Sequence, residues 1–313
     1  MTKALPRVLS HLPKGLLDKV FATYPGIEVF EIPTEGALPE GAEGEVLLTQ
    51  TWGTPNMADV LARGVKWVHT YGTGVNFFPF DVLTGQVLTC SRGASAVPIS
   101  EWVLAMMLAF EKQLPDIWLS APPERWNIAT LGGLHGSTLG LVGLGGIARA
   151  VATRALAFGM KVRALRRTKA PSPVPGVEVV ASLEDLLSTA DHVVIAAPAT
   201  RNTKHLFDAA AFAHLKPGAH LVNIARGDLV DQDALRTALD ADQLALASLD
   251  TVTPEPLPEG HWLYSHPKVR LSAHVSWSTP DSYAGLIDPF VTNLQHFRDG
   301  EELIYQVNVE EGY

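Results

Sequence analysis

Three ionisable residues in the C-terminal half of the chain each follow a short apolar stretch. Arg226 lies in VNIARGDLVD, Glu255 in LASLDTVTPEPLP and His274 in VRLSAHVSW. In an open parallel sheet, ligands bind beyond the carboxyl ends of the strands, so the three side chains could converge on one ligand. They would supply an anion-binding group, a carboxylate and an acid or base. Each residue alone also fits a structural role, as a strand-end ion pair, a solvated loop acid and a polar group at a sheet edge.

A glycine-rich turn between an apolar run and a helical segment predicts a dinucleotide site. The stretch TLGLVGLGGIARAVATRALAFG contains Gly143, Gly145, Gly146, Ile147 and Ala148 in the pattern G-x-G-x-x-G/A. Gly143 permits the tight turn, Gly145 lets the backbone approach a pyrophosphate, and the small Ala148 allows the helix to pack closely on the strand. The amino end of the helix would then face the phosphate charge.

The next predicted strand, KVRAL, ends at two arginines rather than at an acid. Arg166, Arg167 and Thr168 stand about 20 residues after the glycine turn, where an Asp or Glu would bind the ribose 2′-hydroxyl of NAD. A guanidinium binds a 2′-phosphate instead. The sequence therefore favours NADP(H), with NAD(H) left open. The alternative interpretation is a solvated basic loop end.

The elements that must position these residues alternate between strand and helix. Helical segments with start signals at Asn56, Ser182 and Asp231 separate short apolar runs. This alternation predicts an α/β fold with parallel sheets. The runs expected to be strands are RVLSH at 7, EVLLTQ at 45, KWVHTYG at 66, QVLTCS at 86, TLGLVG at 138, KVRAL at 161, HVVIAA at 192, HLVNI at 220 and LALASLD at 244.

The length of 313 residues predicts two domains. A stretch rich in Pro, Gly and Trp at 114–136 separates the two alternating halves, and the apolar helix expected at 100–112 has no clean polar face. We expect this helix to be buried between domains or subunits, so the chain passes from the first domain to the second near residue 100. An ordinary core helix inside the first domain is the alternative.

Composition excludes several classes of protein. A net charge of −9 disfavours nucleic-acid binding. Cys90 is the only cysteine, which rules out an intrachain disulfide and fits a cytoplasmic protein. The most apolar stretch, WVLAMMLAF, is too short to span a membrane, and the N-terminus does not resemble a secretory signal. Histidines such as His192 and His220 show no metal-ligand spacing, so no metal is predicted.

An ordered set of motifs along nearly the whole chain resembles the D-isomer-specific 2-hydroxyacid dehydrogenase family, in particular glyoxylate/hydroxypyruvate reductases. The motifs are GTGV at 72, ISEWVLAMML at 99, the glycine turn, PATRNTKHL at 198, NIARGDLVD at 223, LDTVTPEPLP at 249, AHVSW at 273 and the tail from NLQHFRDG to GY. The resemblance implies two Rossmann-like or flavodoxin-like domains with the active site in the cleft between them. The expected bounds are 1–99 plus 286–313 for the substrate domain and 100–285 for the NADP-binding domain.

The resemblance also implies roles. Arg226, Glu255 and His274 match the family's catalytic set, in which the histidine gives a proton to the carbonyl oxygen of a 2-oxoacid, the glutamate orients and tunes it, and the arginine holds the substrate carboxylate. The expected cofactor contacts are Gly143, Gly145, Gly146, Ile147, Arg166, Arg167, Thr168, Pro198, Thr203, Ile224, Ala225 and Asp250, the last as acceptor for the nicotinamide carboxamide. The expected substrate contacts are Trp52, Thr73, Gly74, Val75, Arg226 and Trp277.

The sequence departs from the family pattern beside the catalytic histidine and before Pro198. Ala273 stands where a proline is usual, the bulky Trp277 replaces a small residue and narrows the pocket, and Ala197 replaces a polar residue or cysteine. The loop that contains Trp52 lacks the Lys or Arg that a phosphorylated hydroxyacid would need, so glyoxylate or hydroxypyruvate is the leading substrate and phosphoglycerate a weaker one. Arg92 could bind a substrate phosphate and so favour phosphoglycerate. The alternative is that Arg92 forms a salt bridge in the domain linker.

Other functions remain open at this point. A protein of another class, which uses nucleotide occupancy to control binding of a partner, could share the scaffold. Formate oxidation is disfavoured, because Glu255 stands where formate enzymes usually have Gln. The apolar helix and the Trp-containing connector resemble the family's dimer-forming arm, so a homodimer is predicted, with a small 2-oxoacid or 2-hydroxyacid as the other partner.

Overall fold

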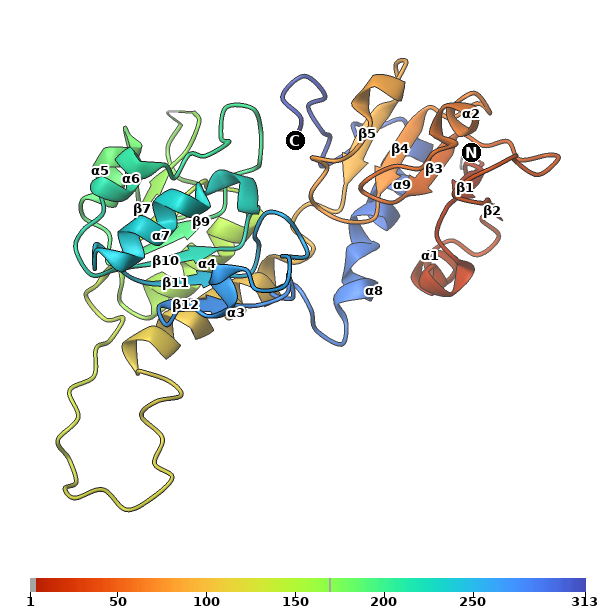
Figure 1. Cartoon of the computed structure of the whole chain (residues 1–313). Helices are drawn as coiled ribbons and strands as arrows, with labels where there is room; N and C mark the ends of the chain where they lie inside the picture. The colour runs from red at the N-terminus through yellow and green to blue at the C-terminus, as the bar shows by residue number, and fades with distance from the viewer. Residues whose placement is uncertain (1–3, 169) are drawn as a thin grey trace. The chain divides into compact units, whose positions relative to one another are not determined.

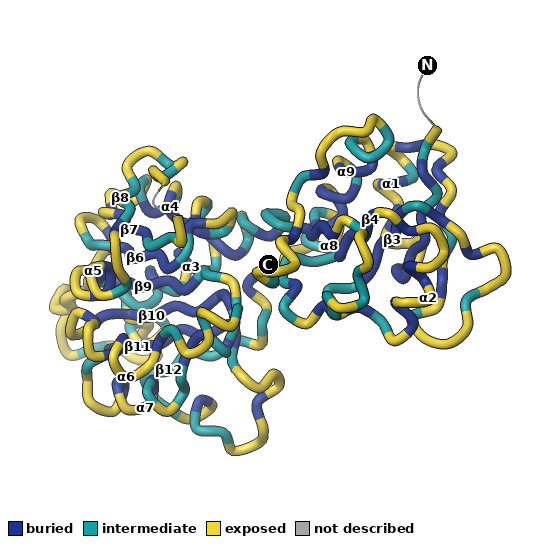
Figure 2. Tube along the Cα trace, turned by 90° about the horizontal axis from the view of Figure 1, so that it is seen from above, coloured by how far each residue is buried: buried dark blue, intermediate teal, exposed yellow. Residues whose placement is uncertain are grey.

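The computed structural model describes residues 4–168 and 170–313 and divides into two compact units. The first unit consists of the chain up to Ser95 together with Thr279–Tyr313, and the second unit is Ala96–Ser278. These divisions lie a few residues before the boundaries expected from the sequence at 99/100 and 285/286. Each unit has its own parallel sheet and its own buried core (Figures 1 and 2).

The first unit contains a five-stranded parallel sheet in the order β2-β1-β3-β4-β5. This is the flavodoxin-like order. The strands are β1 (Val8–Ser10), β2 (Val29–Glu31), β3 (Val46–Thr49), β4 (Trp67–Thr70) and β5 (Val87–Cys90). The helices are α1 (Asp18–Thr23), α2 (Met57–Leu61), α8 (Ser282–Leu286) and α9 (Asp288–Asp299), with short 3-10 turns η1 (Lys14–Leu16) and η2 (Phe80–Val82).

Apolar residues on both faces of the central strands form this core. All four residues of β3 are buried, as expected for a parallel strand covered on two sides. One hydrophobic cluster joins the sheet to α1 and α9, and a second joins it to α2. The C-terminal helix α9 thus completes a unit that begins at the N-terminus, and Trp67 stacks on its Phe290 with ring centroids 5.2 Å apart.

The second unit contains a seven-stranded parallel sheet in the order β12-β11-β10-β9-β6-β7-β8. Counted within the unit, this is the doubly wound order 3-2-1-4-5-6 with a seventh strand added. The strands are β6 (Thr138–Val142), β7 (Lys161–Leu165), β8 (Val177–Val180), β9 (His192–Ile195), β10 (Ala219–Asn223), β11 (Leu244–Leu249) and β12 (Val269–Leu271). The helices are α3 (Ala96–Glu111), α4 (Gly146–Ala157), α5 (Leu183–Leu187), α6 (Ala209–Ala213) and α7 (Gln232–Asp240), with 3-10 turns η3 (Gly227–Leu229) and η4 (Trp262–Tyr264).

Helices cover both faces of this sheet. Buried residues of α3 and α4 form one cluster with β6 and β7, and residues of α5, α6 and α7 form another with β9, β10 and β11. In Figure 2 the central strands β6, β9 and β10 are drawn mostly as buried, and many connecting loops are exposed. No helix in the described parts of the chain is long and apolar enough to cross a membrane.

The predicted α/β class with two parallel-sheet domains is confirmed, and so are the nine strands expected from apolar runs. Of the other three strands, β12 is the apolar stretch before His274, whereas β2 and β8 were not predicted, because VFE and VEVV are short, carry a glutamate and lie at the sheet edges. Ser182 and Asp231 cap their helices as expected, through hydrogen bonds to backbone amides. Asn56 directly precedes α2 as expected, but its side chain does not cap the helix, because its oxygen accepts from the hydroxyl of Thr54 and its amide donates to the carbonyl of Pro33.

Candidate active site

His274 and Glu255 form a hydrogen-bonded pair at the carboxyl edge of the second sheet. His274 follows β12 and Glu255 follows β11, and these strands are neighbours. Nδ1 of His274 lies 2.9 Å from Oε2 of Glu255, and the two side chains are 39% and 38% exposed. The pair is therefore positioned by adjacent strands and open to a ligand.

The charges around Glu255 keep it ionised. Its Oε1 accepts a hydrogen bond from the amide of Val252 at 3.0 Å. Burial alone raises the pKa of the Glu255 carboxyl, but the hydrogen bonds from His274 and Val252 and the charges of His274 and Arg226 outweigh burial and hold this pKa below its usual value. A carboxylate in this state can hold the proton on Nδ1 of the imidazole and leave Nε2 to face a ligand.

Arg226 follows β10, the next strand of the sheet, and begins the turn η3. Its guanidinium donates to the carbonyl of Ala225 at 2.6 Å. Burial lowers the pKa of Arg226 and the Glu255 carboxylate raises it, so the two groups interact electrostatically. Arginine stays cationic in such a setting. The structure thus brings the three residues singled out in the sequence to the ends of three consecutive strands.

Two residues that sequence reasoning missed hold Arg226 near Glu255. Gly227 packs directly on the backbone of Val252 and Thr253, so closely that a Cβ at this position would overlap them. The Asn223 amide donates to the carbonyl of Arg226 at 3.0 Å, and its oxygen accepts from the amide of Ala225 at 3.0 Å. Both lie in the motif NIARGDLVD, but only the tertiary contact shows why an amide and a glycine are needed there.

Asp250 holds the loop that carries His274. Asp250 is buried, its Oδ1 accepts from the hydroxyl of Ser272 at 2.6 Å and from the amide of Val275 at 2.9 Å, and its Oδ2 accepts from the amide of Ser276 at 3.0 Å. Its backbone carbonyl accepts from the amide of His274 at 2.9 Å. Both carboxylate oxygens thus have protein donors, while the expected contact to a nicotinamide carboxamide remains a prediction.

The glycine turn has the geometry of a dinucleotide site. Gly143 has a φ of +100°, and a Cβ there would lie within 3.0 Å of the backbone of Ala196 and Ala197. At Gly145 a Cβ would meet no atom of the described chain within 4 Å, so this side of the turn offers room for a ligand. Ala148 is fully buried against the sheet. Gly145 precedes α4 and supplies no side-chain cap, so the first-turn amides are suited to bind a phosphate.

The sequence predicts that the basic residues after β7 bind a ribose 2′-phosphate, but in the structure the side chain of Arg166 contacts its own loop. The guanidinium of Arg166 donates from Nη1 to the carbonyls of Ala170 at 3.2 Å and Pro171 at 2.8 Å. It therefore fastens the loop in which it lies. Arg167 and Thr168 are exposed at the end of β7. The structure accordingly makes Arg167 a second candidate for contact with a 2′-phosphate.

The remaining expected cofactor residues follow β9 and β10. The hydroxyl of Thr203 donates to the carbonyl of Pro198 at 2.7 Å and accepts from the amide of Thr200 at 2.8 Å, which closes the loop after β9. Ile224 and Ala225 are buried directly after β10. Together with the glycine turn, these segments surround the carboxyl ends of the central strands, where a dinucleotide binds in a doubly wound sheet.

The expected substrate residues of the first unit lie on loops after β3 and β4. Trp52 is 63% exposed. Thr73 donates from its hydroxyl to the carbonyl of Ser91 at 3.1 Å, which fixes the GTGV loop. Among residues 4–168 and 170–313, the amides of Gly74 and Val75 donate to no protein acceptor. Free amides of this kind can bind a carboxylate.

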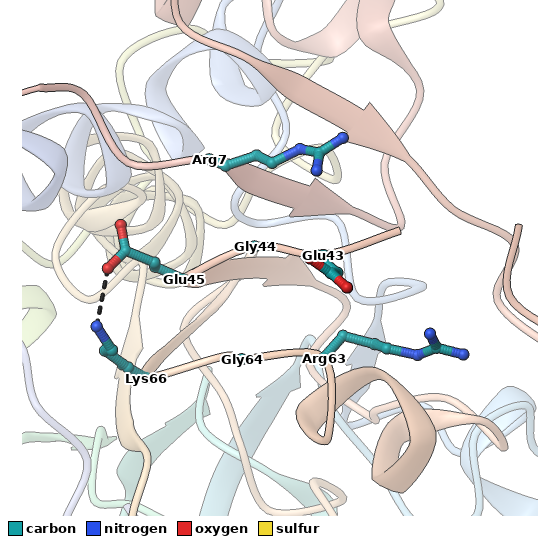
Figure 3. Close-up of a pocket in the computed structure, with 7 residues that line it drawn as sticks. All are labelled: Arg7, Glu43, Gly44, Glu45, Arg63, Gly64 and Lys66. Atoms are coloured by element: carbon teal, nitrogen blue, oxygen red, sulfur yellow. Dashed lines mark hydrogen bonds and ion pairs between the residues drawn. The ribbon is translucent and has the colours of Figure 1, made fainter. Parts of the chain in front are cut away.

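Two hollows lie on the surface of the first unit. One, of about 410 Å³, lies where β1, β3 and β4 begin, and the Glu45–Lys66 salt bridge of 2.9 Å crosses its rim (Figure 3). It faces the amino ends of the strands, opposite the edge at which ligands bind in such sheets. The other, of about 270 Å³, is lined by Arg92, Asp288, Thr292 and Tyr305, among others.

The strand order, the glycine turn and the open amino end of α4 define a dinucleotide-binding domain of the Rossmann type. The chain belongs to the D-isomer specific 2-hydroxyacid dehydrogenase family, since the model of that family's NAD-binding domain matches residues 104–276. The resemblance noted in the sequence is thereby confirmed, and the site suits a nicotinamide dinucleotide.

Individual relatives agree with this assignment. The chain is 31% identical to glyoxylate/hydroxypyruvate reductase A of Serratia proteamaculans over 84% of its own length and 86% of that protein. It is 30% identical to D-3-phosphoglycerate dehydrogenase of Rattus norvegicus over 91% of its length but only 55% of that protein, so it spans about half the length of the phosphoglycerate dehydrogenases it matches. A D-isomer specific 2-hydroxyacid dehydrogenase from Xanthobacter autotrophicus, solved with NADPH and MES, superposes with a TM-score of 0.86 at 26% identity over 99% of this chain and all of that one.

Proposed function

We propose that this protein reduces a small 2-oxoacid to the D-2-hydroxyacid with NADP(H). The observation that carries the proposal is the His274–Glu255 pair at 2.9 Å, with Arg226 at the end of the neighbouring strand. The imidazole supplies a proton, the carboxylate orients the imidazole, and the guanidinium binds an anion. When bound, the nicotinamide supplies the hydride.

His274 acts as the proton donor. Its Nδ1 is occupied by Glu255, so Nε2 is the atom that gives a proton to the carbonyl oxygen as that oxygen gains negative charge. Glu255 stabilises the imidazolium before transfer and keeps the ring in one orientation. After transfer the imidazole is neutral, and solvent can restore its proton because both side chains are more than a third exposed.

Arg226 binds the substrate carboxylate. A guanidinium offers paired donors that match a carboxylate, and its charge also polarises the adjacent carbonyl. The close packing of Gly227 on the Val252–Thr253 backbone fixes the distance between this group and the His274–Glu255 pair. The free amides of Gly74 and Val75 are the second group that we assign to the substrate carboxylate.

NADP(H) is favoured over NAD(H) by the basic loop after β7. No acid stands at positions 166–168 to accept a hydrogen bond from a ribose 2′-hydroxyl, whereas Arg166 and Arg167 place two guanidinium groups, which suit a phosphate, in this loop. The glycine turn, Pro198, Thr203, Ile224, Ala225 and Asp250 are the remaining residues that we assign to the cofactor. The neighbour from Xanthobacter autotrophicus was solved with NADPH.

Glyoxylate and hydroxypyruvate are the leading substrates. The loop with Trp52 offers no cation for a substrate phosphate, and we expect the bulky Trp277, three residues after His274, to favour a small acid. Arg92 supports the second candidate, a phosphorylated hydroxyacid such as phosphoglycerate, because it lines a hollow on the first unit. Asp288 lines the same hollow and opposes an anion there, so we rank this candidate second.

We further propose that the protein is a cytoplasmic homodimer formed through the segment 113–133. This segment leaves the second unit after α3 and returns before β6 as an extended loop (Figure 1). Arg270 fastens its base by donating to the carbonyl of Leu114 at 2.9 Å. It exposes a set of large apolar side chains: Trp118, Leu119, Trp126, Ile128 and Leu131. Apolar side chains in such number favour burial against another chain.

The test is the initial rate of NADPH and NADH oxidation by the purified protein with glyoxylate, hydroxypyruvate and phosphohydroxypyruvate. Faster oxidation of NADPH with either of the first two acids supports the proposal. A preference for phosphohydroxypyruvate would replace it with the second candidate. Silence with all three and with further 2-oxoacids would reject the enzymatic function and favour a nucleotide-dependent binding protein on the same scaffold.

A further inference from the structure

His274 has a backbone conformation that few residues other than glycine adopt. Its φ is +55°, in the left-handed region. Such a conformation persists only where the surrounding structure holds it. The direction of the imidazole follows from the backbone, so whatever holds this φ also decides where Nε2 points.

Asp250 holds only part of this loop. Its backbone carbonyl accepts from the amide of His274, and its carboxylate accepts from the amides of Val275 and Ser276. All these atoms of Asp250 are acceptors, so they can fix N–H groups but not a carbonyl. The carbonyl oxygen of His274 needs a donor from elsewhere.

Trp277 is that donor. Its indole Nε1 donates to the carbonyl oxygen of His274 at 2.9 Å. The ring is half-buried and packs against the hydrophobic cluster built by α3, α4 and β6, which includes Ile99 and Val103. A packed indole has little freedom, so its N–H has a fixed direction. The bond therefore ties the His274 backbone to the core of the second unit.

We propose that Trp277 is a positioning residue that acts through His274. Its N–H locks the carbonyl of His274, stabilises the left-handed backbone and thereby sets the imidazole against Glu255. This inference rests on the proposed role of His274 as proton donor. The role also explains why a bulky residue stands at position 277, which the expected contact with the substrate does not explain. Only an aromatic ring with an N–H can both pack against the cluster and donate the hydrogen bond.

The test compares Trp277→Phe with wild type. Phenylalanine keeps an aromatic ring in the cluster and removes the N–H. We expect kcat to fall by about tenfold, because small errors in the placement of an acid are costly. We expect the KM for NADPH to stay within about twofold, because the glycine turn is untouched. The solvent deuterium isotope effect on kcat should rise, since proton transfer becomes slower. Unchanged kcat and isotope effect would overturn the inference.

Two further variants separate positioning from packing. Trp262→Phe makes the same exchange at a half-buried ring near Arg236, away from the His274 loop, and should leave kcat and the isotope effect at wild-type values. Trp277→Gln keeps an N–H donor but loses the ring. If the N–H is what matters, this variant retains more kcat than Trp277→Phe even though its Tm is lower. The opposite order would assign Trp277 to packing alone.

A spectroscopic readout distinguishes this inference from the proposed function. Wild-type protein that turns over no 2-oxoacid rejects the function, but it leaves the hydrogen bond between His274 and Glu255 measurable. The ¹⁵N signals of the His274 imidazole should differ between wild type and Trp277→Phe, because the ring moves relative to the carboxylate. Identical signals in the two proteins would contradict the inference whatever the activity.

Discussion

Oε2 of Glu255 lies 2.9 Å from Nδ1 of His274, across the ends of two adjacent parallel strands. The contact leaves the opposite ring nitrogen as the atom that can exchange a proton with a ligand. Replacement of His274 should therefore slow the proton transfer and leave cofactor binding largely unchanged.

His274→Ala should lower kcat by about 10³-fold, the usual contribution of a general acid. NADPH binding, measured by fluorescence titration, should change little because the glycine turn lies on another loop. Tm reports whether the loop still folds. Near-normal turnover in this variant would remove His274 from the proposed role.

Glu255→Gln tests the charge of the carboxylate while its size is kept. Turnover should fall by about 10- to 100-fold, because the neutral amide no longer favours the imidazolium. The pKa of Glu255 is lowered in the folded protein, so the pair stabilises the fold above the ordinary carboxyl pKa, and this stability is lost as pH falls through the lower folded value. The difference in unfolding free energy between wild type and variant should be small, because the pair is partly exposed, and should shrink from pH 7 to pH 3. A difference independent of pH would contradict the assignment.

Cofactor choice should depend on the basic loop after β7. Arg166→Asp should raise the ratio of kcat/KM for NADH over NADPH, because it removes a guanidinium and adds an acceptor for the ribose hydroxyl. Arg166 also fastens the loop through the carbonyls of Ala170 and Pro171, so Arg167→Asp is the matched variant that leaves those bonds intact. If only the second variant changes the ratio, Arg167 carries the recognition. If neither does, the preference has another source.

Buried histidines should make the fold sensitive to mild acid. Burial lowers the pKa of His69 to about 3 and that of His192 to about 4, from an ordinary value of 6.5. Between pH 6.5 and the lowered pKa of each histidine, the unfolded chain binds a proton that the folded chain does not. The free energy of unfolding therefore falls as pH drops below about 6.5. Each histidine should contribute a slope approaching about 1.4 kcal/mol per pH unit.

Urea unfolding from pH 7 to pH 5 measures this slope. His192→Asn should reduce this slope, because it removes a buried imidazole. A slope that is unaffected by His192→Asn, or stability that is constant over this range, would contradict the prediction.

The proposed dimer depends on exposed apolar side chains of the segment 113–133. Trp118→Asp combined with Trp126→Asp should convert the dimer to a monomer, measured by light scattering, because the two rings are 72% and 74% exposed and would be buried on association. Val309→Asp places the same charge on an exposed apolar site outside the segment and should leave the dimer intact. A wild-type monomer at working concentration would reject the dimer.

The sequence by itself determined the class of fold and the candidate residues. Apolar runs separated by helical segments predicted nine strands, because burial on both faces of a parallel sheet requires continuous apolar residues. The glycine turn was recognisable because only glycine permits the φ of +100° at position 143. Arg226, Glu255 and His274 could be named because each follows a strand of the same sheet.

Only the tertiary structure decided how these residues are held. The short edge strands β2 and β8 carry too little apolar pattern to be recognised without their neighbours. The contact of Gly227 with Val252, the use of both Asp250 oxygens by the His274 loop, and the bond from Trp277 to His274 join residues on different strands or across a turn. Such bonds depend on the direction of each side chain, which follows from packing and not from the order of residues in the chain.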